Sequence, residues 1–181
     1  ELAGKKKQLE SKKNKKTAGR LSKDVDDIEA RIADLQELIM NPFRNIFVHR
    51  YRDTKAFIRT MSLEAMGHWM TTYPKFFVKN DFLKYMGWCL NDPEPSVRIT
   101  VLQSIYSLLE AEDNVELMQT FTERFMNRFL EMVEDCDTKV AACAVRTATQ
   151  FIKYDFLEDE QGAEIPSLLW DANPEISAAA A

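Results

Sequence analysis

The sequence predicts an all-helical fold of stacked helix pairs, and three observations lead to that prediction. After residue 43, no stretch alternates apolar and polar residues for long enough to form a sheet. Apolar residues instead recur at spacings of three and four, the period of an amphipathic helix. The chain also has only 5 Gly and 6 Pro, few for the many turns of an all-β domain.

A repeat of about 40 residues organises the predicted helices. Asp53, Asp92 and Asp135 lie 39 and 43 residues apart, and each stands five residues before a β-branched residue that opens a helix. The second helices match at an offset of 43 residues, which pairs Phe82 with Phe125. Two helices in such a period are typical of HEAT-like repeats, which stack into a right-handed α-solenoid. We expect each Asp to cap its helix and to accept backbone N–H groups at the turn.

A long charged helix is predicted before the repeats. Residues 1–16 contain almost no apolar residues and are expected to form a basic, frayed arm, and residues 17–40 to form the helix. Asn41-Pro42 should end it, because the residue before a proline avoids helical geometry. The apolar stripe of this helix consists of Leu21, Val25, Ile28, Ile32, Leu35 and Ile39. The stripe covers under three heptads, so we expect it to dock on a neighbouring helix of the same protein rather than form a free coiled coil.

The HEAT-like domain is predicted to span residues 43–155. Its helices are expected at 54–73, 79–91, 96–109, 115–134 and 138–154. Pro74 should close the first of them, and Pro93 with Pro95 should mark the next boundary. Residues 156–181 carry a weaker helical pattern interrupted by two prolines. The chain begins at Glu1 rather than Met, and we expect it to be a segment of a longer protein.

Charge is distributed unevenly along the chain. The first 23 residues carry nine Lys or Arg against two Glu, a balance of +7, and the remainder has a balance of −12. A basic arm on an acidic domain suggests contact with double-stranded DNA, because lysine clusters release counterions from phosphates. A solvated helix face or a mobile tail is the alternative. The candidate DNA-binding residues are Lys5, Lys6, Lys7, Lys12, Lys13, Lys15, Lys16 and Arg20.

The sequence contains no catalytic constellation. Neither His49 nor His68 begins a metalloprotease or deaminase signature, and no phosphate-binding, dinucleotide-binding or nucleophile-elbow motif is present. The three cysteines have no CxxC spacing, which argues against a zinc site or a disulfide framework and fits a reducing compartment. We therefore expect no enzyme activity, no cofactor, no metal, no small-molecule substrate and no membrane segment.

One aromatic residue, Trp88, is predicted on the polar face of its helix. On a wheel of about 100° per residue, Trp88 falls about 240° from Phe82, beside Asp81 and Lys84. The apolar arc of the same helix consists of Phe82, Leu83, Met86, Cys89 and Leu90. Trp88 could pack under a neighbouring element, or it could be an exposed anchor for a partner, since Trp is enriched at binding hot spots.

Several of these stretches resemble a known family. IFVHRYRD (46–53), GHWM (67–70), FLKYMGWCLND (82–92) and PSVRITVLQSIYSL (95–108) look like the stromalin conservative domain of the stromal antigen subunit of cohesin. The resemblance extends upstream over 21–40 and downstream through FTERFMNRF (121–129), and covers roughly residues 15–155.

The resemblance implies a nuclear, chromosome-associated protein that binds the kleisin chain of cohesin and supports sister-chromatid cohesion. It also implies a surface that captures short aromatic-containing peptides from regulators such as shugoshin. That surface would consist of Tyr51, Arg52, Lys84, Trp88, Phe121 and Arg124. The chain departs from the family pattern at Asn80 and Thr120, which leaves peptide preference open.

Other interpretations of the residues stay open at this point. Arg52 could serve only to hold the turn before Asp53, and Arg124 could form an ion pair with a nearby Glu. The chain could also be a HEAT-repeat scaffold or a DNA-binding helical module outside cohesin, although the long ordered signature argues against this.

Overall fold

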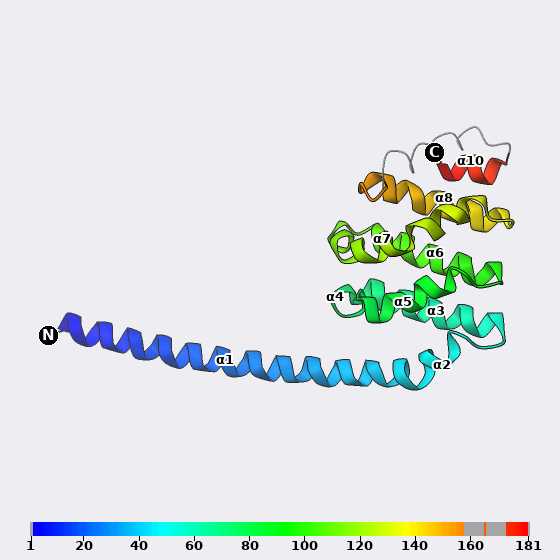
Figure 1. The fold of residues 1–181 in the computed structure, drawn as a ribbon. Coiled ribbons are helices and arrows are strands. Elements are labelled where there is room, and N and C mark those ends of the chain that lie inside the picture. Colours follow the sequence, from blue (N-terminus) through cyan, green and yellow to red (C-terminus); the bar gives the residue numbers. More distant parts are fainter. Residues whose placement is uncertain (1, 158–164, 166–172, 181) are drawn as a thin grey trace. The chain divides into compact units, whose positions relative to one another are not determined.

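The computed structural model describes residues 2–157, 165 and 173–180, with side chains from Ser22 onward. The chain divides into two compact units, Glu1–Val48 and His49–Ala181. The regular structure of the described residues consists of helices, with no strand among them (Figure 1). The prediction of an all-α fold is confirmed.

The first unit contains one long helix, and both of its ends differ from the prediction. Helix α1 (Leu2–Pro42) is helical through residues 2–16, where the sequence predicted a frayed arm. That stretch is rich in Lys, Gln, Glu, Ala and Leu, which are strong helix formers. Pro42 also does not stop the helix. Its backbone keeps helical angles (φ −62°, ψ −32°), and the chain continues into a π-helix, η1 (Phe43–Phe47).

The π-helix follows from the chemistry of proline. Pro42 has no N–H group to donate to the residue four positions earlier, so the α-helical ladder loses one bond. A wider π turn next to such a defect lets the helix proceed in a different bonding register. Four residues of the predicted stripe of α1, Val25, Ile28, Ile32 and Leu35, are between 42% and 58% exposed. Its docking on another helix therefore stays a prediction.

The second unit consists of helix pairs joined by tight turns, close to the predicted ranges. After the short α2 (Val48–Arg50), its helices are α3 (Ala56–Thr72), α4 (Pro74–Phe77), α5 (Asn80–Cys89), α6 (Pro95–Leu109), α7 (Val115–Glu131), α8 (Thr138–Lys153) and α10 (Pro174–Ala180). Two single 3₁₀ turns, η2 (Glu112–Asn114) and η3 (Met132–Glu134), flank α7. Helix α4 was not predicted. Pro74 ends α3 as expected but also opens α4, because its fixed φ suits a first helical position.

The helices of the second unit form two layers. Helices α3, α6, α8 and α10 pack one on the next, and α5 packs on α7 beside them (Figure 1). The side chains between the layers are apolar and fully buried, which is the arrangement expected when no single repeat can bury its own apolar face. The largest of them include Leu63, Met66, Met70, Leu83, Met86, Leu90, Leu102, Ile105 and Leu108. The HEAT-like prediction is confirmed.

The repeated aspartates hold the turns between helices. The carboxylates of Asp53, Asp92 and Asp135 each accept the N–H of the residue two positions later, at 2.9, 2.9 and 3.0 Å. This confirms that they bond backbone amides at the turn. None of the three is a helix N-cap, however. Among α3, α6 and α8, only α8 has a side-chain cap, provided by Asp137.

Two arginines connect consecutive turns through these aspartates. Arg59 donates to the backbone carbonyl of Asp53 at 2.8 Å and to both carboxylate oxygens of Asp92 at 2.7 and 2.6 Å. Arg98 repeats the pattern one repeat later: it donates to the carbonyl of Asp92 at 2.8 Å and to the carboxylate of Asp135 at 2.7 Å. We call this series the arginine–aspartate ladder. Each arginine stands six residues after an aspartate of the repeat, a signal the sequence analysis missed.

The second rung of the ladder is a buried ion pair. The side chains of Arg98 and Asp135 are both 7% exposed. Burial alone raises the pKa of Asp135, but hydrogen bonds from Arg98 and from the N–H of Asp137, with the charge of Arg98, bring that pKa below its ordinary value. The carboxylate therefore stays ionised and keeps its partner at neutral pH.

We predict that Arg98→Met lowers the free energy of unfolding by about 3–5 kcal/mol, because it leaves the carboxylate of Asp135 buried without a counter-charge. Urea denaturation followed by circular dichroism measures the change. Arg146→Met is the matched control, since Arg146 is exposed and forms no ion pair with any described residue. The control should change stability by about 0.5 kcal/mol or less. An equal decrease in the free energy of unfolding in both variants would contradict a structural role for the ion pair between Arg98 and Asp135.

Candidate partner-binding surface

Trp88 is exposed on the polar face of a helix whose apolar face is buried. Helix α5 buries its whole predicted apolar arc, with exposures of 0–7% for Phe82, Leu83, Met86, Cys89 and Leu90. Trp88 is 49% exposed. The helical-wheel prediction for Trp88 is therefore confirmed, because its indole lies on the face of α5 that points away from the core. Exposure of one large aromatic on a stable helix is a feature that binding surfaces share.

Trp88 forms a cluster of three aromatic rings with Tyr51 and Tyr85. Tyr85 lies one turn before it on α5, edge-on, with ring centroids 5.4 Å apart. Tyr51, from the turn after α2, lies 4.9 Å from Tyr85 and 6.4 Å from Trp88. Both tyrosines are half-buried, so they hold one side of the indole in place and leave the other side open. Tyr85 was not predicted, although its spacing of three residues from Trp88 places both on one helix face.

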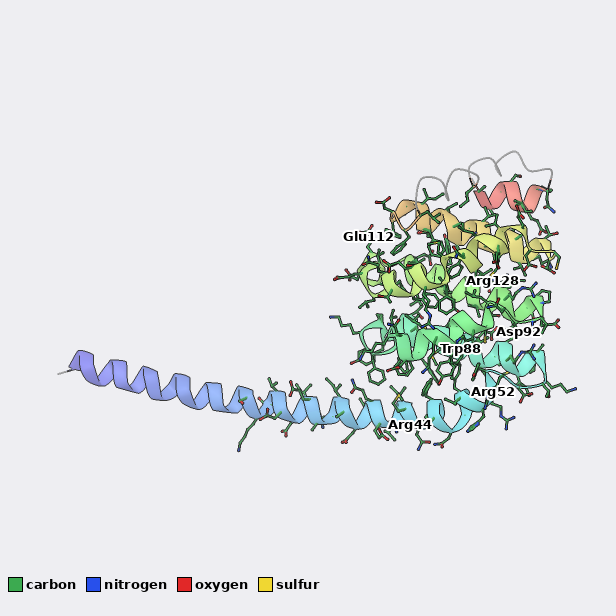
Figure 2. All side chains as sticks on the ribbon, viewed as in Figure 1. Arg44, Arg52, Trp88, Asp92, Glu112 and Arg128 are labelled. Carbon is green, nitrogen blue, oxygen red and sulfur yellow. The ribbon has the colours of Figure 1, made fainter. Side chains whose placement is uncertain are left out.

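Cationic side chains surround this cluster. Arg52 is exposed and makes no hydrogen bond or ion pair with any described residue, so the structure gives no support to the interpretation that it only holds the turn (Figure 2). The ammonium group of Lys84 lies 5.3 Å from the centroid of the Tyr85 ring. A cation over an aromatic face is attracted by the ring quadrupole and still has donors left for another group.

Helix α7, which packs on α5, carries a third cation, Arg124. Gly87, the residue before Trp88, faces the ring of Phe125, and a Cβ atom at position 87 would overlap that ring. The guanidinium of Arg124 lies 5.6 Å from the centroid of the same ring. Arg128 fixes the pair of helices further by donating to the carbonyl of Leu90 at 3.2 and 3.1 Å. Gly87 thus permits the close approach of α5 to α7, the helix that carries Arg124.

Arg124 keeps its charge available to a ligand. The sequence left open an ion pair with a neighbouring Glu, but Arg124 is exposed and pairs with no carboxylate among the described residues. Its guanidinium stacks near Phe125 instead, which orients the planar group without using its N–H donors. Gly87 and Phe125 were both missed from the sequence, because only the packing of α5 on α7 shows their contact.

Phe121 requires a correction. The sequence placed it on the binding surface, but its ring is 2% exposed and packs against Phe125 and Phe129 at centroid distances of 4.9 and 6.2 Å. It lies four residues before Phe125 on the core side of α7. Phe121 therefore supports Phe125 from the interior and does not offer its ring to a partner on this surface.

Comparison with known proteins identifies the family. A family model described as the stromalin conservative domain matches residues 52–126. The match runs from Arg52 through α3, α5 and α6 into α7, and so includes Trp88 and Arg124. The chain belongs to the stromalin conservative domain family.

Relatives of this stromalin conservative domain are cohesin subunits by name. The chain is 35% identical over 156 residues to "Sister-chromatid cohesion protein 3" of Arabidopsis thaliana, covering 86% of this chain and 14% of that protein. It is 30% identical over 172 residues to "Cohesin subunit psc3" of Schizosaccharomyces pombe, covering 94% and 18%. The chain therefore spans less than a fifth of the length of these relatives.

A solved structure has the same fold. The cohesin subunit Scc3 of Z. rouxii matches with a TM-score of 0.70 at 29% identity, over 88% of this chain and 20% of that one. The agreement covers more of the chain than the family model does. The fold thus extends beyond the residues that carry the family signature.

The basic arm of the chain lies in α1, before the residues that the family model matches. The candidate DNA-binding residues Lys5 to Arg20 belong to that continuous helix, but their side chains lie outside the described part of the structure. Among the described residues, no cluster of His, Cys, Asp or Glu could hold a metal ion. None of the helices searched has a stretch long and apolar enough to cross a bilayer.

The cysteines of the domain differ sharply in environment. Cys89, on the buried side of α5, is 6% exposed, and its sulfur lies 4.0 Å from the carbonyl oxygen of Tyr51. Burial raises the pKa of Cys89 to about 12, with a further rise from Asp92 that Arg59 partly opposes. Cys136 is exposed.

We predict that maleimide modifies Cys136 at neutral pH well before Cys89, because only the thiolate reacts and burial suppresses it. Mass spectrometry of proteolytic peptides at successive times measures the order. In denaturing urea the two cysteines should react at similar rates. Early modification of Cys89 in the folded protein would contradict the buried position of this face of α5.

Proposed function

We propose that this domain is a non-catalytic interaction module of a cohesin subunit. In this proposal it binds the kleisin and short aromatic-containing peptides of regulators such as shugoshin, and so supports sister-chromatid cohesion on chromosomes in the nucleus. The single observation that carries the proposal is the 49% exposure of Trp88 on a helix whose other large apolar residues are buried. The cohesin names of its relatives support the biological setting.

The surrounding side chains suit a particular kind of ligand. The open side of the Trp88 indole can take an aromatic or apolar side chain of an extended peptide. Arg52 follows Tyr51 in the chain, Lys84 lies over the ring of Tyr85, and Arg124 is on the adjacent helix α7, so acidic residues next to the peptide's aromatic residue would be favoured. Tyr51 and Tyr85 already hold the indole, which lowers the entropy lost when a peptide binds.

We predict that Trp88→Ala weakens binding by about 2 kcal/mol or more, roughly 30-fold, because it removes the centre of the aromatic cluster. Isothermal titration calorimetry measures the change, with the kleisin subunit and with a short peptide that carries one Phe or Tyr between acidic residues. The matched control is Ile152→Ala, which truncates another exposed apolar residue, 43% exposed, on α8.

Two results would contradict the proposed surface. One is unchanged affinity for both ligands in a Trp88→Ala protein with a native circular dichroism spectrum. The other is an equal loss in Ile152→Ala. Replacing the aromatic residue of the peptide by Ala should also abolish the difference between wild type and Trp88→Ala.

Contact of α1 with double-stranded DNA is the second candidate function. The nine basic residues of the first 23 fall within a single helix, α1. Twenty-three residues of α-helix span about 35 Å. The positive charge is therefore concentrated along a straight segment that can lie beside the phosphates of a DNA duplex. Such binding would not read base sequence.

We predict that replacing Lys12, Lys13, Lys15 and Lys16 by Gln weakens DNA binding and lowers the slope of log K against log salt by about 3 to 4, because each phosphate contact contributes about 0.9. Fluorescence anisotropy with a labelled duplex at several salt concentrations measures the slope. Gln preserves helix propensity. Replacing the exposed Lys55 and Lys75 by Gln is the control. An unchanged slope in the α1 variant would contradict DNA binding by these lysines and indicate that this part of α1 is only a solvated helix.

A further inference from the structure

A recessed surface crosses the layer formed by α3, α6 and α8. A hollow of about 240 Å³ lies between α3 and α6, and a second of about 320 Å³ lies between α6 and α8. Gln103 and Ser107 of α6 line both hollows, so the two meet at this helix. We call the pair of hollows the transverse recess.

The charge of the transverse recess changes from one end to the other. Glu64, Gln103 and Arg146 each stand eleven residues after an aspartate of the repeat, so they occupy equivalent positions on three helices, and all three are exposed. Of the described residues that line the hollows, Glu64 is the one carboxylate and Arg146 the one arginine or lysine. Neither forms an ion pair with another described residue. A ligand with a basic group at one end and an acidic group at the other is complementary to this arrangement.

The lining of the recess combines apolar contact with hydrogen-bond acceptors. Leu102 and Thr147 line the second hollow and are 0% and 1% exposed. The hydroxyl groups of Thr71, Thr100 and Ser104 donate to carbonyl oxygens of their own helices at 3.1, 3.0 and 2.8 Å, and Thr147 does so at 2.9 Å. Each hydroxyl oxygen keeps lone pairs that can accept from a ligand. An extended peptide offers N–H groups along its length, because they are not used within the segment.

The span of the recess sets the length of the segment. Neighbouring packed helices lie about 8–10 Å apart, so Glu64 and Arg146 are separated by about 16–20 Å across two such steps. A Cβ atom at position 67 would overlap the hydroxyl of Ser104, so α3 and α6 are closely packed. An extended chain covers about 3.3–3.6 Å per residue, so about five or six residues join the two ends.

We propose that the transverse recess is a docking site for an extended peptide segment with a basic residue near Glu64 and an acidic residue near Arg146. The side chains between these residues occupy the two hollows, and main-chain N–H groups bond the hydroxyl oxygens. The recess lies on α3, α6 and α8, whereas Trp88 and Arg124 lie on α5 and α7. The ligand needs no aromatic residue, and the inference does not depend on the function proposed for the Trp88 surface.

The first test uses a phage-displayed library of random octapeptides as the probe. The library is panned on the Trp88→Ala protein, which removes the other proposed site. Selected peptides should be enriched in one acidic and one basic residue about five or six positions apart. Parallel panning on the same protein with Arg146→Glu should remove the enrichment of the acidic residue, because like charges repel at that end.

The second test exchanges charge between protein and peptide. Fluorescence anisotropy of one selected peptide should show about 10-fold weaker binding to the Arg146→Glu protein. Replacing the acidic residue of the peptide by Lys should restore most of that affinity, which a general loss of structure cannot do. Lys139→Glu is the matched control, since Lys139 is an exposed cation of the same helix outside the recess. The control should change affinity by less than about 2-fold.

The third test needs no substitution in the recess. Cys143 lines the second hollow and is half-buried, whereas Cys136 is exposed and lies outside the hollow. A selected peptide at ten times its Kd should slow the modification of Cys143 by N-ethylmaleimide about 10-fold, because only the unoccupied protein reacts. The rate at Cys136 should not change. Mass spectrometry of proteolytic peptides measures both rates.

Enrichment of the charge pair, recovery of affinity by the exchanged peptide and protection of Cys143 would support the proposal. A library that yields no enriched sequence, or the same sequences from the Arg146→Glu protein, would overturn it. An unchanged rate of Cys143 modification with peptide bound would do the same. Self-association of the chain that Arg146→Glu abolishes would also overturn it, since a second copy would then occupy the recess.

Discussion

The ion pairs between consecutive turns are the interaction on which the rest of the second unit depends. Apolar burial alone drives the helices together, but it leaves their rotation and register loosely defined because it has no direction. Arg59 and Arg98 supply that direction, since each planar guanidinium bonds two turns at once. The repeats therefore stack at a fixed spacing, and helices α5 and α7 inherit defined positions in the second layer.

That fixed framework permits a large aromatic residue to stay in water. Exposing half of an indole forgoes hydrophobic stabilisation of the order of 1 kcal/mol or more, which a stable helix pair can tolerate. Gly87 lets α5 approach Phe125, and the tyrosines on the other side restrain the indole. The indole is thus preorganised by the residues packed around it. Buried Phe121 belongs to this supporting set.

Local sequence rules lose to their surroundings at two places in the chain. Pro42 should stop a helix, yet α1 passes through it and becomes a π-helix within one residue. The repeat aspartates should cap their helices, yet they accept backbone N–H groups at the turn, and Asp92 and Asp135 also accept an arginine from the neighbouring repeat. At Pro42 the helix continues in another hydrogen-bond register, and at the turns the aspartates bond different partners. The helices and turns were therefore predicted correctly, while the helix end and the caps were not.

The sequence by itself determined the fold class, the repeat and the position of Trp88. Each follows from a period along the chain, because a helix converts spacing directly into a face. Only the tertiary structure decided that Tyr85 and Phe125 belong to the surface and that Phe121 does not. It also decided that Arg59 and Arg98 reach aspartates 33 and 37 residues away. Contacts between helices depend on how two faces are rotated against each other, and a one-dimensional period carries no information about that rotation.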